Sequence, residues 1–429
     1  MRHVERHLRP RVSEALDSFR VVVLHGARQS GKTTLAKQVA ADRGGTYTTL
    51  DDDQTLLAAL EDPRTFLGEH RHPLVIDEIQ LGGDRLVRAI KTAVDDDPAR
   101  GRFLLTGSTD FLSVPTISES LAGRAAIMRL WPLSVAEIHG APGSSLSAWF
   151  EGGVEPGEVS QSTRPDYLRL VCRGGYPEAV DLPSATRRMW FESYTETVIS
   201  RDVAALADVR RAGALRALLR LAAARTAGEL NVADWCRRLG IDRGTVESYL
   251  GWLRMVFLIH ELPAWTRSPA PRVVRRPKLH LADTGLAAAL MNVDADALRP
   301  ATATPTGALL ETFVANEVAR QISAGGEPLH LHHCRDGSGH EVDLVIERSD
   351  GAVVAVEVKA TASPGPDHLR HLVWLRDRLD EASPGTFRAG VLLHTGERRL
   401  RVGDRLCSSP IDVLWRGGSG QKSGSLSSA

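Results

Sequence analysis

The segment Val21-Val22-Val23-Leu24-His25-Gly26-Ala27-Arg28-Gln29-Ser30-Gly31-Lys32-Thr33-Thr34-Leu35 decides the fold of the first part of the chain. An apolar, β-branched run precedes a glycine-containing loop and good helix formers, which predicts strand, loop and helix. The spacing fits the pattern G-x-x-x-x-G-K-[ST], in which backbone N–H groups surround a phosphate. The residues predicted to bind the phosphates of ATP are Gly26, Ala27, Arg28, Gln29, Ser30, Gly31, Lys32, Thr33 and Thr34.

Two side chains of this loop have roles that follow from phosphate chemistry. Lys32 is expected to lie over the β- and γ-phosphates, and Thr33 to offer its hydroxyl to Mg²⁺. The helix predicted to begin near Thr33 directs the positive end of its dipole at the same anion. ATP and Mg²⁺ are therefore the expected cofactors.

The segment Pro73-Leu74-Val75-Ile76-Asp77-Glu78-Ile79-Gln80 supplies the second half of this site. Its continuous apolar run is typical of a strand buried on both faces of a parallel sheet, and ligands bind at the carboxyl ends of such strands. We expect Asp77 to hold the Mg²⁺ ion and Glu78 to polarise the water that attacks ATP. The alternative is an exposed acidic turn.

Two later strands offer further candidates for the same reaction. The strand that ends at Thr106 and Ser108 could place either hydroxyl against the attacking water or the γ-phosphate, although it could also be a simple exit from the sheet. Arg124 introduces the next strand and is a candidate arginine finger, acting within its own subunit or across an interface. The alternative for Arg124 is a surface arginine.

Together these segments, with an extra strand at Thr46-Tyr47-Thr48-Thr49-Leu50, resemble the AAA-type branch of phosphate-loop ATPases. With Gly174-Gly175-Tyr176-Pro177-Glu178 added, nearly the whole chain resembles a large family of prokaryotic AAA-type ATP-binding proteins. That resemblance implies an α/β parallel-sheet ATPase domain and a C-terminal domain related to restriction endonucleases.

The composition fits a folded protein of two to three domains. The chain has 429 residues, 42% hydrophobic, with 53 basic and 53 acidic side chains, so its formal charge is zero. The four cysteines are scattered and form no C-x-x-C pair, which indicates reduced thiols. We see no apolar signal segment and no apolar run long enough for a membrane span, and we expect a cytoplasmic protein.

The middle of the chain is predicted to be a helical region with a winged helix. Val232 to Val246 has the helix, glycine turn, helix pattern of a helix-turn-helix, in which Arg243 and Thr245 would lead at a DNA groove. Ser268 to Lys278 is a basic, proline-broken segment that could form a wing for nucleic acid or a solvated loop. Such winged helices in ATPases also serve as lids or protein contacts.

Two alternating strands near the C-terminus carry a second set of acidic residues. They run from His340 to Glu347 and from Val353 to Lys359, with Gly351 last in the turn between them. A hairpin centred on Asp350 pairs Glu347 with Val353, Asp343 with Glu357, and Glu341 with Lys359. The predicted apolar face holds Val342, Leu344, Ile346, Val354, Val356 and Val358, and the other face gathers the charged residues.

Carboxylates placed opposite each other repel unless a positive charge lies between them, and a divalent cation or Lys359 could supply it. The arrangement resembles the D…E-x-K signature of the PD-(D/E)XK nuclease superfamily, and Glu311 matches that superfamily's acidic helix residue. The resemblance implies that Asp343, Glu357 and Glu311 bind Mg²⁺. It also implies that Lys359 steadies the attacking water or the developing charge.

We therefore predict a Mg²⁺-dependent ATPase that couples ATP turnover to a DNA-directed, nuclease-like module. The alternative is a signalling or defence switch in which the nuclease-like fold is a scaffold. The expected parts are an ATPase domain at 1–140, a loop and helical lid at 141–200, a winged-helix domain with basic wing at 201–300, a nuclease-like domain at 301–416 and a disordered tail at 417–429. ATP and DNA are the expected partners, with a homo-oligomer possible.

Overall fold

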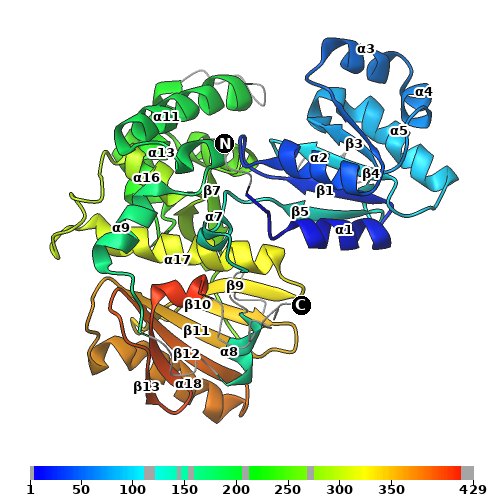
Figure 1. Ribbon diagram of the computed structural model, residues 1–429. Helices are drawn as coiled ribbons and strands as arrows, with labels where there is room; N and C mark the ends of the chain where they lie inside the picture. Colours follow the sequence, from blue (N-terminus) through cyan, green and yellow to red (C-terminus); the bar gives the residue numbers. More distant parts are fainter. Residues whose placement is uncertain are drawn as a thin grey trace, which may run out of the picture.

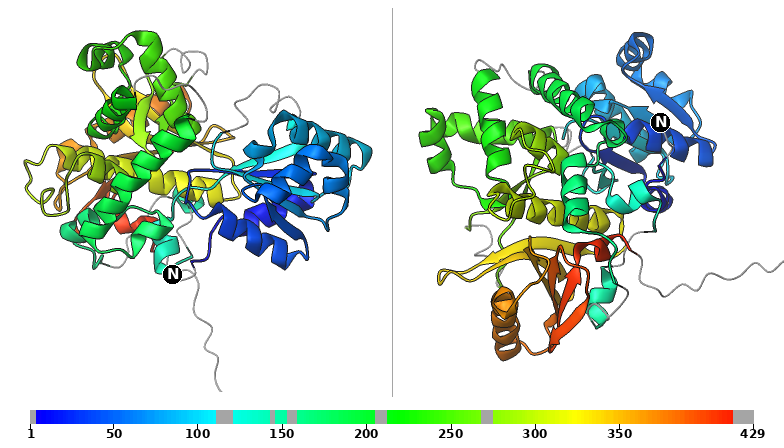
Figure 2. Two further views of the ribbon diagram at one scale, coloured as in Figure 1. Left: turned by 90° about the horizontal axis from the view of Figure 1, so that it is seen from above. Right: turned by 60° about the vertical axis from the view of Figure 1, so that its left-hand side comes forward.

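A computed structural model of the chain describes residues 4–110, 121–142, 146–152, 159–204, 212–267 and 275–416 (Figure 1). The predicted tail at 417–429 and part of the predicted wing, 268–274, lie outside these residues. The first part of the chain stands beside the rest, and it does not cover the C-terminal sheet in any of the three views (Figures 1 and 2).

The N-terminal part is a five-stranded parallel sheet with the order β2-β3-β4-β1-β5, which confirms the predicted parallel α/β fold. Alternate residues of β1 pack on opposite faces: Val21 and Val23 lie with α5, whereas Val22 and Leu24 lie with α1 and α2. The elements are α1 (Arg9–Ser18), β1 (Val21–His25), α2 (Lys32–Asp42), β2 (Thr46–Thr49), α3 (Asp53–Glu61), α4 (Pro63–Gly68), β3 (Leu74–Asp77), η1 (Ile79–Gly82), α5 (Gly83–Asp96), β4 (Phe103–Gly107) and β5 (Ala125–Arg129).

The middle part is helical. It comprises α7 (Val135–His139), α9 (Arg164–Arg173), α10 (Pro177–Val180), α11 (Ser184–Thr197), the π-helix η3 (Val198–Val203), α13 (Ala212–Ala224), α14 (Val232–Leu239), α15 (Arg243–Met255) and α16 (Thr284–Leu290). Helix α8 (Ser147–Glu151) lies between α7 and α9 in the sequence but packs against the C-terminal sheet (Figure 1). A small antiparallel sheet with the order β6-β8-β7 lies among these helices, formed by β6 (Gly228–Glu229), β7 (Ile259–Leu262) and β8 (Lys278–Leu281).

The predicted helix, turn and helix correspond to α14 and α15. Gly240 has a φ of 64° at the turn, which glycine adopts without strain, and the side chain of Asp242 caps α15 by accepting from Thr245 N at 2.9 Å. The hydroxyl of Thr245 also bonds Asp242, and Arg243 pairs with Glu247, so both predicted groove residues make local contacts.

Lys278 was predicted to end a solvated basic segment, and that prediction is wrong. The residue opens β8, where its backbone pairs with Leu262 and Glu229, and only 1% of its surface is exposed. The basic segment thus ends before Lys278. Strand β8 begins at this residue, and the charged side chain of Lys278 lies in the interior.

The C-terminal part is a six-stranded mixed sheet with the order β13-β14-β12-β11-β10-β9. Helix α17 lies against one face, where Val354 and Val356 pack, and α18 lies against the other, with Val353 and Ala355. The elements are α17 (Pro305–Ala324), β9 (Leu329–Arg335), β10 (Glu341–Arg348), β11 (Val353–Lys359), η5 (Pro366–Leu369), α18 (Arg370–Ala382), β12 (Phe387–His394), β13 (Leu400–Gly403), β14 (Leu406–Pro410) and η6 (Ile411–Leu414).

The hairpin of β10 and β11 has the predicted register from Leu344 to Glu347, but this paired stretch does not include the predicted pairs of Asp343 with Glu357 and of Glu341 with Lys359. Glu347 pairs with Val353 and Leu344 with Val356, and Gly351 has a φ of 84° in the turn. The predicted apolar face is wrong at Val342, which packs with Val345 under α18 and not with Leu344. The physical reason is a register shift between Val342 and Val345 where β10 pairs with β9, a type of irregularity that re-aims neighbouring side chains.

Helix α17 runs between the middle part and the C-terminal sheet (Figure 1). It bonds to both of these parts: Asn316 Nδ2 donates to Leu281 O at 3.0 Å and Glu317 accepts from Val135 N at 3.1 Å in the middle part, and Gln321 Nε2 donates to Leu414 O at 2.7 Å in the C-terminal part. Eleven of its 20 residues are buried, and they include polar and charged residues. An ordinary surface helix buries only one apolar stripe, so α17 is a largely enclosed helix.

Candidate functional sites

The glycine loop between β1 and α2 places Lys32 and Thr33 at the first turn of α2. Gly26 approaches the backbone so closely that a Cβ atom there would lie 2.2 Å from Leu130 O, so the loop requires glycine at this position. The Lys32 ammonium donates to the carbonyl oxygens of Gly26 and Ala27, both at 2.9 Å. Phosphate oxygens in this loop would compete with those carbonyls for the same ammonium.

Asp77 is the centre of a polar cluster at the carboxyl end of β3. Its Oδ2 accepts from the hydroxyl of Thr33 at 2.7 Å and from that of Tyr47 at 2.8 Å, and its Oδ1 accepts from Thr106. The predicted Thr33 and Asp77 therefore lie together, with oxygen donors of the kind that Mg²⁺ prefers. Tyr47 was not predicted as a site residue, because it was read only as part of a strand.

Glu78 follows Asp77 with a left-handed backbone, at a φ of 55°. Its Oε2 accepts from Ser108 Oγ at 3.1 Å and from the side-chain amide of Gln80. The unusual backbone at a non-glycine residue is typical of functional sites. The predicted Ser108 thus contacts Glu78, and the predicted Thr106 contacts Asp77.

Arg124 lies away from the phosphate loop. It precedes β5, whose first residue pairs with Val21 at the amino end of β1, so it is separated from the loop by the length of a strand, roughly 15 Å. Its guanidinium forms a two-bond ion pair with Asp95, at 2.7 and 3.0 Å. Arg124 therefore does not complete the phosphate site of its own chain, and its role across an interface stays a prediction.

Residues of the middle part cover the phosphate loop, and the sequence did not assign them to it. Arg28 Nη1 contacts Asp202 Oδ1 of the π-helix at 3.0 Å, and Tyr194 OH donates to Arg28 O at 3.2 Å. Asp202 of η3 thus reaches the loop directly from the middle part. The signal in the sequence was the family motif around Tyr176, whose hydroxyl oxygen lies 3.0 Å from that of Tyr194.

Electrostatics in the phosphate loop predict a pH dependence. Burial lowers the pKa of Lys32 to about 8, although Glu78 and Asp77 oppose that effect. The free protein must therefore take up a proton above this pH to present an ammonium to phosphate. We expect ATP affinity, measured by titration calorimetry, to be constant below about pH 7.5 and to fall by up to about tenfold per pH unit above about pH 8.

The matched control for this pH dependence is Lys32→Arg, because a guanidinium stays protonated throughout the range. Its affinity for ATP, whatever the absolute value, should show no decline between pH values of about 8 and about 9. An equal decline in both proteins would assign the effect to another group.

The second predicted site contains a residue that the sequence did not assign to it. Lys278 Nζ lies 2.6 Å from Glu311 Oε1, 2.7 Å from Glu341 Oε1 and 3.5 Å from Asp343 Oδ1. Burial alone would lower the pKa of Lys278, but the carboxylates of Glu311, Asp343 and Glu341 raise it above its usual value. The ammonium is therefore charged and holds together acidic residues from α17 and β10.

Glu357 and Lys359 form the other half of this second site. Lys359 Nζ donates to Glu357 Oε1 at 2.5 Å, and Asp343 Oδ2 accepts from Val358 N at 2.9 Å. Burial raises the pKa of Glu357, and the neighbouring Asp343 raises it further. The predicted residues Asp343, Glu357, Lys359 and Glu311 are thus brought into one region.

The fit of Mg²⁺ to this second site is poor in the observed arrangement. Within the described ranges, no group of three or more His, Cys, Asp or Glu side chains could hold a metal ion. The space between Glu311 and Asp343 is bridged by the ammonium of Lys278. In the observed arrangement an ammonium, and not a metal ion, neutralises these carboxylates.

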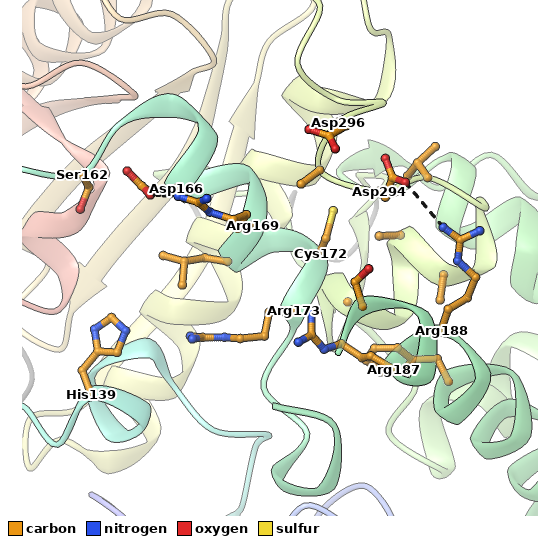
Figure 3. Close-up of a pocket in the computed structure, with 18 of the residues that line it drawn as sticks. His139, Ser162, Asp166, Arg169, Cys172, Arg173, Arg187, Arg188, Asp294 and Asp296 are labelled. Atoms are coloured by element: carbon orange, nitrogen blue, oxygen red, sulfur yellow. Dashed lines mark hydrogen bonds and ion pairs between the residues drawn. The ribbon is translucent and has the colours of Figure 1, made fainter. Parts of the chain in front are cut away.

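A separate cavity of about 870 Å³ lies between α9, α11 and α16 (Figure 3). It is lined by arginines and aspartates, among them Arg188 and Asp294, whose charged groups are 3.9 Å apart. In Figure 3, Arg173 and His139 point toward one another across its lower part. Neither the phosphate loop nor the C-terminal carboxylates line it, so it belongs to neither predicted site.

Comparisons with known proteins find three family matches along the chain. Residues 18–139 match the family described as "AAA domain", residues 164–297 match "Domain of unknown function (DUF8612)", and residues 306–414 match "Domain of unknown function (DUF4143)". The phosphate loop, the parallel sheet and this match together define the N-terminal part as an AAA-type P-loop ATPase domain.

The similar proteins are of two kinds. "Uncharacterized protein Mb2031c" of Mycobacterium bovis and "Uncharacterized protein Rv2008c" of Mycobacterium tuberculosis are each 27% identical over 410 residues, which is 95% of this chain and 84% of each relative. A solved structure, the Walker-type ATPase PABY2304 of Pyrococcus abyssi, is 15% identical with a TM-score of 0.42, covering 66% of this chain and 94% of the other.

None of the helices in the described ranges is both long enough and apolar enough to cross a bilayer.

Proposed function

We propose that this protein is a Mg²⁺-dependent ATPase that works as a conformational switch. The observation that carries the proposal is the cluster around Asp77, in which Thr33 and Thr106 converge on one carboxylate while Glu78 stands beside it. Asp77 and Thr33 would hold the Mg²⁺ ion, which when bound neutralises charge on the β- and γ-phosphates.

Each protein group would then have one task in hydrolysis. Lys32 binds the β- and γ-phosphates, exchanging the carbonyls of Gly26 and Ala27 for phosphate oxygens. Glu78 accepts the proton of the attacking water, or orients that water through its carboxylate. Ser108 fixes the position of Glu78 by donating to it.

The contacts of Arg28 connect the nucleotide to the rest of the chain. Its ion pair with Asp202 joins the loop to η3, and burial raises the pKa of Asp202, which means that its charge is only partly compensated by Arg28. Phosphate oxygens that attract the Arg28 guanidinium would weaken this pair and loosen η3 from the loop. Binding and release of ATP would in this way change the position of the middle part.

The test is phosphate release from ATP by the wild-type protein, with Mg²⁺ and with EDTA, together with the Glu78→Gln protein. The proposal requires release that depends on both Mg²⁺ and Glu78. A protein that binds ATP but never releases phosphate would reduce the proposal to a nucleotide-binding switch.

A second candidate is a DNA-directed module with nuclease-like chemistry in the C-terminal part. The support for it is that Asp343 Oδ2 accepts from Val358 N, between Glu357 and Lys359, which bond each other. The ammonium of Lys278 between Glu311 and Asp343 supports a scaffold instead, since it leaves no obvious place for a metal ion. The geometry therefore favours the switch with a scaffold domain over an active nuclease.

We expect no Mg²⁺- or Mn²⁺-dependent cleavage of plasmid or single-stranded DNA that depends on Glu357, with or without ATP. The assay compares the wild-type protein with Glu357→Ala from the same preparation procedure, so that a contaminating nuclease acts equally in both. Cleavage by the wild type that is lost in Glu357→Ala would establish the nuclease and reject the scaffold.

A further inference from the structure

The C-terminal carboxylates and Lys278 come from separate parts of the fold. Lys278 opens β8 in the small sheet of the middle part, Glu311 lies on α17, and Glu341 and Asp343 lie on β10. Lys278 is 1% exposed and Asp343 is 7% exposed, so this contact is shielded from water. An ammonium from one part of the chain thus fills an acidic site formed by another.

The Lys278 Nζ atom is surrounded by carboxylate oxygens, as a bound cation would be. Three carboxylate oxygens lie within 3.5 Å of the Lys278 Nζ, two of them at 2.6 and 2.7 Å. An ammonium has three N–H donors and no acceptor, so it can satisfy three such oxygens at once. Removing it would leave like charges facing one another in a poorly solvated place.

We propose that Lys278 is the resident cation of the C-terminal site, standing where a divalent metal ion would otherwise bind Asp343 and Glu311. The site is then closed to metal as long as β8 keeps its place in the sheet. This inference concerns the same carboxylates as the DNA candidate above, and it does not depend on ATP hydrolysis.

The neighbours of β8 explain why the lysine is held rather than mobile. The strand is bonded on both sides, to β6 and β7, and Asn316 of α17 donates to Leu281 O at its other end. Directly after β8, the buried Asp283 accepts from Gly175 N at 2.7 Å. Gly175 belongs to the motif with Tyr176, which contacts Tyr194 beside the phosphate loop.

A series of contacts connects the strand of Lys278 to the phosphate loop. It runs from Arg28 through Tyr194 and Tyr176 to Asp283 and then along β8 to Lys278. A displacement of β8 that withdraws the ammonium would expose Asp343 and Glu311 to solvent cations. The lysine thus acts as an internal plug whose removal opens a metal site.

The experiment measures Mn²⁺ binding to the nucleotide-free full chain by titration calorimetry and by the EPR signal of free Mn²⁺. Lys278→Met keeps the length of the side chain and removes its charge. We expect this variant to bind one more equivalent of Mn²⁺ than the wild type, and Lys278→Met/Asp343→Asn to lose that equivalent. Lys359→Met is the matched control: it removes the neighbouring ammonium, leaves Lys278 in place, and should gain no equivalent.

A comparison that leaves Lys278 intact keeps the inference testable even where Lys278→Met does not fold. Wild type and Asp343→Asn should bind the same number of Mn²⁺ equivalents, because the wild-type site holds lysine. An equivalent present in the wild type and missing in Asp343→Asn would overturn the inference. So would a folded Lys278→Met protein that gains no Mn²⁺.

Discussion

Glu78→Gln should lower the rate of ATP hydrolysis by about 100-fold or more while leaving ATP affinity within a few-fold of wild type. The glutamine keeps the size of the side chain and can still accept from Ser108 Oγ, which lies 3.1 Å from the carboxylate. It cannot take a proton from water, so the step that needs a base loses its base. Turnover is measured as phosphate release at saturating ATP, and affinity with a fluorescent nucleotide.

The control for this prediction is Glu69→Gln, which makes the same chemical change at an exposed position after α4 in the same domain. Its turnover and affinity should match the wild type. Glu78→Gln with wild-type turnover would remove Glu78 from the reaction. Equal losses of turnover and affinity would instead indicate a damaged fold.

Glu317→Ala should cost about 3–5 kcal/mol of the free energy of unfolding. Glu317 is fully buried on α17, accepts from Val135 N at 3.1 Å and pairs with Arg320. Alanine leaves the Val135 N–H without that acceptor and leaves the Arg320 guanidinium, 8% exposed, with Asp283 at 3.7 Å as its remaining ion-pair partner among the described residues. The measurement is the urea dependence of unfolding, followed by tryptophan fluorescence.

Glu317→Gln separates the two parts of that cost. The amide oxygen can still accept from Val135 N, so only the charge opposite Arg320 is lost, and the destabilisation should be smaller than for alanine. Burial raises the pKa of Glu317, which is a further reason for the neutral replacement to be tolerated better. A Glu317→Ala protein within about 0.5 kcal/mol of wild type would contradict the prediction.

The phosphate site could be predicted from the sequence because each of its motifs lies within one short segment. Gly26 to Thr33 form one continuous sequence motif with a characteristic spacing, and Asp77 ends an apolar run, so local patterns predicted both halves. The parallel order of the strands then brought Thr33 to 2.7 Å from Asp77. Even the distance of Arg124 from the phosphate loop could have been predicted. In a parallel sheet, a residue that precedes a strand lies at the opposite edge from a loop that follows a neighbouring strand.

Only part of the C-terminal site could be predicted from the sequence. The turn at Gly351 fixed the register of β10 and β11, since hairpin geometry is a property of neighbouring residues. Lys278 lies 33 positions before Glu311, and nothing near it signals burial. The displaced Val342 depends on how β10 pairs with β9, and such an irregularity has no signature in one strand alone.

Helix α17 limits how this chain could exchange parts with its relatives during evolution. The matched families end at residue 297 and begin again at 306, so a genetic crossover between them would transplant α17 with the C-terminal sheet. Yet Asn316 and Glu317 on that helix bond Leu281 and Val135 of the segments left behind. A transplanted helix would therefore have to carry side chains that bond the new partners as Asn316 and Glu317 bond Leu281 and Val135.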